Sequence, residues 1–265
     1  MLKFKKNLYL VKILICLIPL FFCFIVFFTG NIDYQGMFET KKYTSVALHW
    51  MDDYTKKKIE PTRLPGYPAI IYIVFKIFGA NNLTALLFVQ SIIGCFTFYF
   101  IIKILEELKI DDSFLILSTL AFNFAIIFRF SLFLPNFFFI FILTLAIFFF
   151  TKFYFKQKFY YFFLFCFFFS SLCLVRPIIH FSIYITYPLI ILYLIRLNEK
   201  FSFKLACIIT LLAFYFLSIG TQFLRSFNYD KSFVYSSQSG VHFFWVISCL
   251  SKKYACGNRD MKVFE

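Results

Sequence analysis

Long runs of apolar residues constrain the fold of this chain more than any other feature. Crossing the hydrocarbon core of a bilayer takes about 20 consecutive apolar residues. By that rule we expect spanning segments near 8–28, 84–105, 113–130, 134–151, 159–175, 177–196 and 203–224. Because a chain in lipid must satisfy its own backbone hydrogen bonds, these runs are predicted to be helices. The sequence therefore predicts an all-α, polytopic transmembrane helix bundle with about seven spans, forming a single membrane domain over residues 1–265.

The composition favours the lipid bilayer as the partner of this chain. Hydrophobic residues make up 62% of the 265 residues, which is more apolar surface than a soluble domain needs. A formal net charge of +14 would suggest nucleic acid as a partner of a soluble protein. Here many of the cations lie in short segments between apolar runs, as membrane anchors do. We therefore expect no nucleic-acid binding.

The short cationic segments also predict an orientation. They carry Lys3, Lys5 and Lys6, then Lys103 and Lys109, then Lys152, Lys156 and Lys158, then Arg196, Lys200 and Lys204. With seven spans all of these fall on one side of the membrane. Since basic loops stay in the cytoplasm, the N-terminus is predicted to be cytoplasmic. The loop 31–82 and the tail 225–265 are then extracytoplasmic.

Polar side chains that could do chemistry concentrate in the loop 31–82. Asp33 and Glu39 follow the first span closely, and a carboxylate there could act as general base or hold a divalent metal. The polar part of this loop ends in R-L-P-G-Y-P over residues 63–68. The apolar segment Ala69–Phe78 behind it is too short to cross the bilayer. We predict that the loop 31–82 contains interfacial helices, one of them over this segment, for which the start of the next span is an equal alternative.

Arg176 is a second charged candidate, because it stands between two apolar runs. An arginine at the centre of a spanning helix costs about 2.5–3.5 kcal/mol. Arg176 therefore needs a phosphate, a carboxylate or a water-filled cavity, unless its side chain reaches the membrane surface. Both interpretations stay open. His180 lies about one helical turn further on, where a packed side chain is the more common role.

The order of these features resembles the C-type membrane glycosyltransferases of the dolichyl-phosphate-mannose–protein mannosyltransferase class, which is glycosyltransferase family 39-like. Bacterial aminoarabinose transferases belong to the same C-type group. The likeness rests on a basic start before one span and on the Tyr43-x-x-x-Ala47 step. It also rests on R-x-P-G-Y-P over 63–68 with its apolar continuation, and on S-L-C-L-V-R-P over 171–177.

The resemblance implies a glycosyltransferase of the bacterial cytoplasmic membrane. It would move a sugar from a polyprenyl-phosphate donor to an extracytoplasmic lipid, glycan or protein acceptor. Asp33 or Glu39 would be the catalytic carboxylate that assists deprotonation of the acceptor hydroxyl, or would hold a divalent metal if one is needed. Arg63 and Arg176 would bind the donor phosphate. Substrate contacts would come from Tyr43, Tyr67 and His180.

Two alternatives to an active transferase remain. Members of the class are usually longer, so we expect a truncated chain, and an inactive truncated transferase is the first alternative. A non-catalytic transporter or flippase-like protein is the second. Transporters tend to break their helices and line them with polar groups near the midplane. The predicted spans here have few polar midpoints, which favours the transferase.

Overall fold

The computed structural model describes residues 2–29, 38–53, 64–111, 135–176 and 178–230, with Ile116 and Thr119 as single residues. Every regular element in this part of the chain is a helix, which confirms the all-α prediction for it. The elements are α1 (Leu2–Thr29), α2 (Phe38–Asp53), α3 (Gly66–Phe78), α4 (Leu83–Glu107), α6 (Pro135–Lys156), α7 (Phe159–Ser171), the 3₁₀ helix η1 (Leu172–Leu174), α8 (Ile178–Arg196) and α9 (Phe201–Asp230).

Four helices in the described part are long and apolar enough to cross a membrane. They are Leu8–Phe28, Leu83–Glu107, Asn136–Lys156 and Phe201–Leu224. The prediction of a multi-pass integral membrane protein is thereby confirmed. Helices α7 and α8 cover the predicted spans 159–175 and 177–196, but their apolar stretches are shorter. The predicted span 113–130 falls outside the described residues, so the number of seven stays a prediction.

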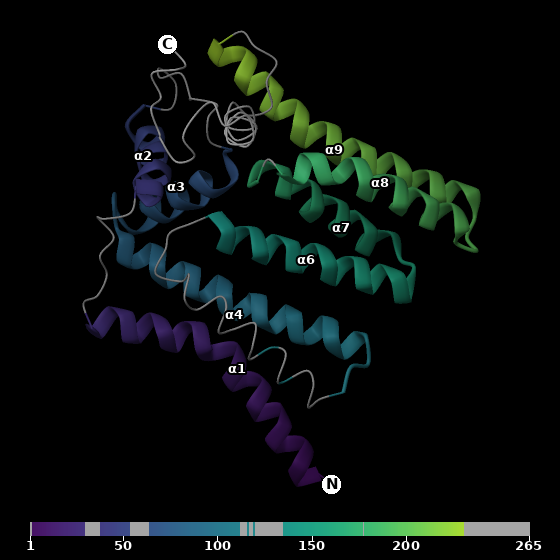
Figure 1. The fold of residues 1–265 in the computed structure, drawn as a ribbon, viewed down its shortest axis with the longest axis horizontal. Helices are drawn as coiled ribbons and strands as arrows, with labels where there is room; N and C mark the ends of the chain where they lie inside the picture. Colours follow the sequence, from purple (N-terminus) through teal and green to yellow (C-terminus); the bar gives the residue numbers. More distant parts are fainter. Residues whose placement is uncertain are drawn as a thin grey trace, which may run out of the picture.

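The long helices lie side by side, and α2 and α3 sit together at one end of them (Figure 1). Along the stack α1 packs on α4, α4 on α6, α6 on α7 and α7 on α9. We call the end that carries α2, α3 and the first residues of α4 and α6 the loop end. The opposite end holds the last turns of α4, α6 and α8 and the first turns of α7 and α9. We call it the lysine end, because Lys103, Lys152, Lys156, Lys158, Arg196, Lys200 and Lys204 belong to these turns and the connections between them.

Helix α3 begins earlier than the sequence suggested. Pro65 occupies its N-cap position and Pro68 its first turn, where the missing N–H of proline costs nothing. The two prolines are therefore compatible with a helix that begins at Gly66. Beyond α3 the chain turns through Gly79 at φ 101 and Asn81 at φ 60, and α4 starts anew. The segment thus does not run on into α4 as one helix.

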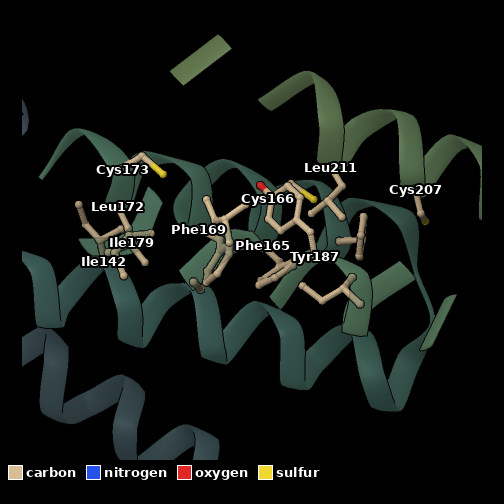
Figure 2. Packing of buried hydrophobic residues seen from close by; sticks show 14 of the residues in the cluster. Ile142, Phe165, Cys166, Phe169, Leu172, Cys173, Ile179, Tyr187, Cys207 and Leu211 are labelled. Atoms are coloured by element: carbon tan, nitrogen blue, oxygen red, sulfur yellow. The ribbon is translucent and has the colours of Figure 1, made fainter. Parts of the chain in front are cut away.

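Two apolar cores meet at the start of α3. The larger core joins α6, α7, η1, α8 and α9, and Figure 2 shows Phe165, Cys166 and Phe169 gathered around Tyr187 within it. The smaller core joins the end of α1 with α2, α3 and the start of α4. Leu64 belongs to the larger core and Tyr67 to the smaller one. The P-G-Y-P step therefore links the two halves of the bundle.

Candidate functional site

The two sequence motifs that lie far apart in the chain contact each other. A Cβ atom added to Gly66 would lie 2.8 Å from the carbonyl oxygen of Leu174 and 2.8 Å from Cγ2 of Val175. Such an approach is open only to glycine, which has no side chain. Leu64 is buried in the same cluster as Val175. The P-G-Y-P step is thus packed against the L-V-R-P step.

Arg176 lies directly after this contact, between η1 and α8. Its backbone N–H donates to the carbonyl oxygen of Leu172 at 3.0 Å, and its own carbonyl oxygen accepts from the N–H of Ile179 at 3.3 Å. Its side chain is partly buried. Among the described residues, none forms a hydrogen bond or ion pair with the guanidinium group. Because this group is always charged, it is ready to receive an anion.

An apolar groove adjoins the contact between the motifs. Its volume is about 270 Å³, and it lies between α6, α7 and η1. Its lining is almost wholly apolar: Gly66, Phe138, Phe141, Ile142, Phe167, Phe168, Ser171, Leu174 and Val175. Val175 lines the groove and directly precedes Arg176, whose guanidinium group has no partner among the described residues. This arrangement suits a ligand with an apolar tail and an anionic head.

Tyr67 fixes the next part of the site. Its side chain is buried, and Gln90 Nε2 of α4 donates to its hydroxyl oxygen at 3.1 Å. The ring of Tyr43 from α2 lies edge-on to the Tyr67 ring, with centroids 5.4 Å apart. Burial raises the pKa of the Tyr67 phenol far above its ordinary value, so its hydroxyl stays protonated. Tyr43 and Tyr67, two of the three predicted substrate contacts, are thus buried against each other.

Gln90 was not singled out from the sequence, although a signal for it was present. It is an amide inside an otherwise apolar predicted span, and polar side chains in spanning helices usually hydrogen-bond to a neighbouring helix. Gln90 does so with Tyr67, and its side chain is buried. Its Oε1 atom has no hydrogen-bond partner in the described part of the chain. Gln90 therefore belongs to the packing that holds α3 on α4.

His180 is placed apart from the two tyrosines. It lies in the first turn of α8, with its ring stacked on that of Tyr215 from α9 at a centroid distance of 6.2 Å. Its Nε2 atom is 3.3 Å from the hydroxyl oxygen of Tyr184. Tyr43 and Tyr67 instead pack in the smaller core with α1 and α4. His180 thus lies close to Arg176 in the sequence, but its ring contacts Tyr184 and Tyr215 rather than Tyr43 and Tyr67.

Three predicted site residues are not described at the level of their side chains. Asp33 and Arg63 lie outside the described residues. Glu39 is part of α2, one helical turn before Tyr43, but nothing is described of its side chain. In the described part of the chain no group of three or more His, Cys, Asp or Glu side chains is arranged to hold a metal ion. The predicted catalytic acid and its metal therefore stay predictions.

Fold and site together define a multi-pass helical membrane protein with a cation beside an apolar groove at its loop end. No protein-family model, curated protein or solved structure matches this chain. The inference about function therefore rests on the residues and contacts given above.

Proposed function

We propose that this chain is a membrane glycosyltransferase that moves a sugar from a polyprenyl-phosphate donor to an extracytoplasmic lipid, glycan or protein acceptor. One observation carries the proposal: the two motifs of the family resemblance pack on each other at Gly66, beside an apolar groove whose lining residue Val175 directly precedes Arg176, a cation with no partner among the described residues. A polyprenyl phosphate needs this combination, because its isoprenoid chain requires apolar surroundings and its phosphate requires a cation.

The donor would lie across the groove and the arginine. The isoprene units nearest the phosphate would pack on the phenylalanines of α6 and α7, and the phosphate would bind Arg176. Arg63 directly precedes Leu64, which is buried in the same cluster as Val175, so it is our second candidate for the phosphate. Guanidinium groups at a leaving phosphate stabilise the negative charge that develops as the bond to the sugar breaks.

The acceptor would be activated by a carboxylate of the loop 31–82. Glu39 or Asp33 would take the proton of the acceptor hydroxyl, or would hold a divalent metal beside it. The acceptor oxygen bonds to the anomeric carbon as the bond from that carbon to the phosphate oxygen breaks. Polyprenyl phosphate leaves. Glu39 is favoured by its place in α2, one turn before the Tyr43 ring that packs on Tyr67.

The proposed orientation follows from the lysine end. Because its cations would be held in the cytoplasm, the loop end with Arg176 would face outward. The chain would then act at the outer surface of the bacterial cytoplasmic membrane. Donor and acceptor would both arrive from the extracytoplasmic side.

The test measures transfer in cells that produce the chain, by mass spectrometry of surface glycolipids and glycans. We expect a sugar-bearing product that is formed only in cells that produce the chain. Arg176→Gln should lower the rate of sugar transfer about tenfold or more. Either Glu39→Gln or Asp33→Asn should abolish transfer, with an equal amount of protein in the membrane. Arg196→Gln is the matched control, because Arg196 is exposed in the last turn of α8 at the opposite end.

Two results would count against the proposal. Full transfer in both Glu39→Gln and Asp33→Asn would remove the carboxylate from the mechanism. Movement of a lipid across liposome membranes without sugar transfer would favour the flippase-like alternative. Binding of polyprenyl phosphate through Arg176 without any sugar transfer would instead favour an inactive transferase.

A further inference from the structure

A second cavity lies at the lysine end, between α4 and α6, and the proposed sugar transfer makes no use of it. Its volume is about 560 Å³. It is lined by Tyr99, Phe100, Lys103, Glu106, Glu107, Lys109, Phe148 and Lys152. We call it the lysine cavity. Both of its helices are long enough to span a membrane, so their last turns lie where lipid headgroups begin.

The carboxylates of the lysine cavity are already neutralised. Lys12 of α1 donates to Glu106 Oε1 at 2.8 Å, and Lys103 donates to Glu106 Oε2 at 2.8 Å. Lys152 of α6 pairs with Glu107 of α4. These bonds join α1, α4 and α6. They also leave the carboxylates little repulsion to exert on an incoming anion.

The ammonium groups retain capacity to bind an anion. Each can donate three hydrogen bonds, and in the described part of the chain no partner is found for Lys109. Lys103 Nζ lies 5.7 Å from the centroid of the Tyr99 ring, and Lys152 Nζ lies 5.5 Å from that of Phe148. Such cation–π contacts hold the ammonium groups in place. Counting Lys12, four ammonium groups surround two carboxylates, and the balance is positive.

An aromatic wall completes the lysine cavity. The rings of Phe100 and Phe148 are in contact, with centroids 5.1 Å apart. A free phosphate ion would gain nothing from this apolar surface. A phospholipid would gain contacts from it, because its acyl chain can pack along such a wall and continue into the bilayer. Basic pockets between spanning helices are places where anionic headgroups bind.

We propose that the lysine cavity binds an anionic phospholipid. Its headgroup phosphate lies among Lys103, Lys109 and Lys152, and its acyl chain packs along Phe100 and Phe148. The purely structural alternative is that the charges only fasten the helices together. That alternative accounts for the Glu106 and Glu107 bonds, but leaves Lys109 and the open cavity without a role.

The experiment uses the purified full chain and measures lipid binding by native mass spectrometry. Phosphatidylglycerol is compared with phosphatidylcholine, and soluble glycerol phosphate is the third probe. We expect phosphatidylglycerol to bind more tightly than phosphatidylcholine, and glycerol phosphate not to displace it at equal concentration. Each lysine removed should weaken phosphatidylglycerol binding about fivefold, so K103Q/K109Q should weaken it more than K109Q alone.

Lys158→Gln is the matched control. Lys158 is an exposed lysine of the lysine end, next to α7, that does not line the cavity. It should leave binding unchanged. Should K103Q/K109Q fail to fold, K109Q alone decides, since Lys109 forms no side-chain bond among the described residues. Equal binding of the two lipids, an equal loss in K158Q, or displacement by glycerol phosphate at equal concentration would each overturn the proposal.

Discussion

At the scale of single residues, Gly66 packs tightly against the backbone of Leu174, where the two halves of the bundle meet. We expect Gly66→Ala to lower the free energy of unfolding by about 1–3 kcal/mol, as overpacking in a tight interface does. The reason is that the new Cβ would lie 2.8 Å from a backbone carbonyl, which cannot move aside as a flexible side chain can. Thermal unfolding of the purified protein in detergent measures the change.

Gly220 supplies the control for this prediction. It lies inside α9, and a Cβ added there would meet nothing within 4 Å. Alanine in a helix interior is favoured over glycine by about 0.5–1 kcal/mol. Gly220→Ala should therefore raise the melting temperature slightly. Equal behaviour of the two alanine variants would show that the contact at Gly66 is not tight.

The hydrogen bond between Tyr67 and Gln90 permits a second prediction at this scale. Tyr67→Phe leaves the buried amide of Gln90 without its acceptor and should cost about 1–3 kcal/mol of stability. Gln90→Leu alone should cost a comparable amount. The double variant should cost much less than the sum, because no buried polar group is left unpaired. Chemical unfolding in detergent gives the four values, and strict additivity would contradict the bond.

Only part of this detail could be predicted from the sequence. The motifs around Gly66 and Arg176 could be recognised in the sequence. Their contact could not, because it depends on tertiary structure that no local pattern encodes. Tyr43, Tyr67 and His180 were predicted as substrate contacts, a role that stays a prediction, and the structure brings only the rings of Tyr43 and Tyr67 together in a buried contact. Gln90 was missed because its partner follows from how α3 lies on α4.

At the scale of helices, the α6–α7 pair allows a direct test of packing. Phe153 and Phe162 are fully buried, with ring centroids 4.8 Å apart. Phe162→Ala should destabilise the protein by about 3 kcal/mol, at the lower end of the range for buried phenylalanine. In a membrane the loss is mainly one of packing contacts, since lipid is as apolar as the core. Phe155→Ala is the control, because 50% of that side chain is exposed.

Unfolding in detergent compares the two phenylalanine variants. A cost for Phe155→Ala as large as that for Phe162→Ala would mean that the α6–α7 interface is not the one described. The expected order is set by burial alone, because the two substitutions remove the same side chain.

Helices could be predicted where length and apolar character coincide. The runs near 8–28, 84–105, 134–151 and 203–224 match the four helices that can span. Interfacial helices were predicted in the loop 31–82, but α2 was not located there, because charged residues separate the apolar ones that form its buried face. Tyr43, Ala47 and Trp50 recur at helical spacing and are all buried. That these residues form a buried face is evident only from the packing of α2 on α3.

At the scale of the whole molecule, the proposed orientation predicts which end is accessible from outside the cell. In a chain freed of its own cysteines, we expect Ala80→Cys at the loop end to react with a membrane-impermeant maleimide in intact cells. Ser202→Cys at the lysine end should react only after the cells are opened. Both positions are exposed. The reverse pattern would place Arg176 toward the cytoplasm and remove the extracytoplasmic site.

The binding of polyprenyl phosphate is the most direct measurement, because it needs no knowledge of the sugar or the acceptor. A radiolabelled polyprenyl phosphate is titrated onto the purified full chain, onto Arg176→Gln and onto Arg196→Gln. We predict saturable binding to the unmodified chain and to Arg196→Gln. We predict binding at least about tenfold weaker to Arg176→Gln, as loss of a charge-assisted contact implies. Absence of binding, or equal binding to all three proteins, would contradict the proposed donor site.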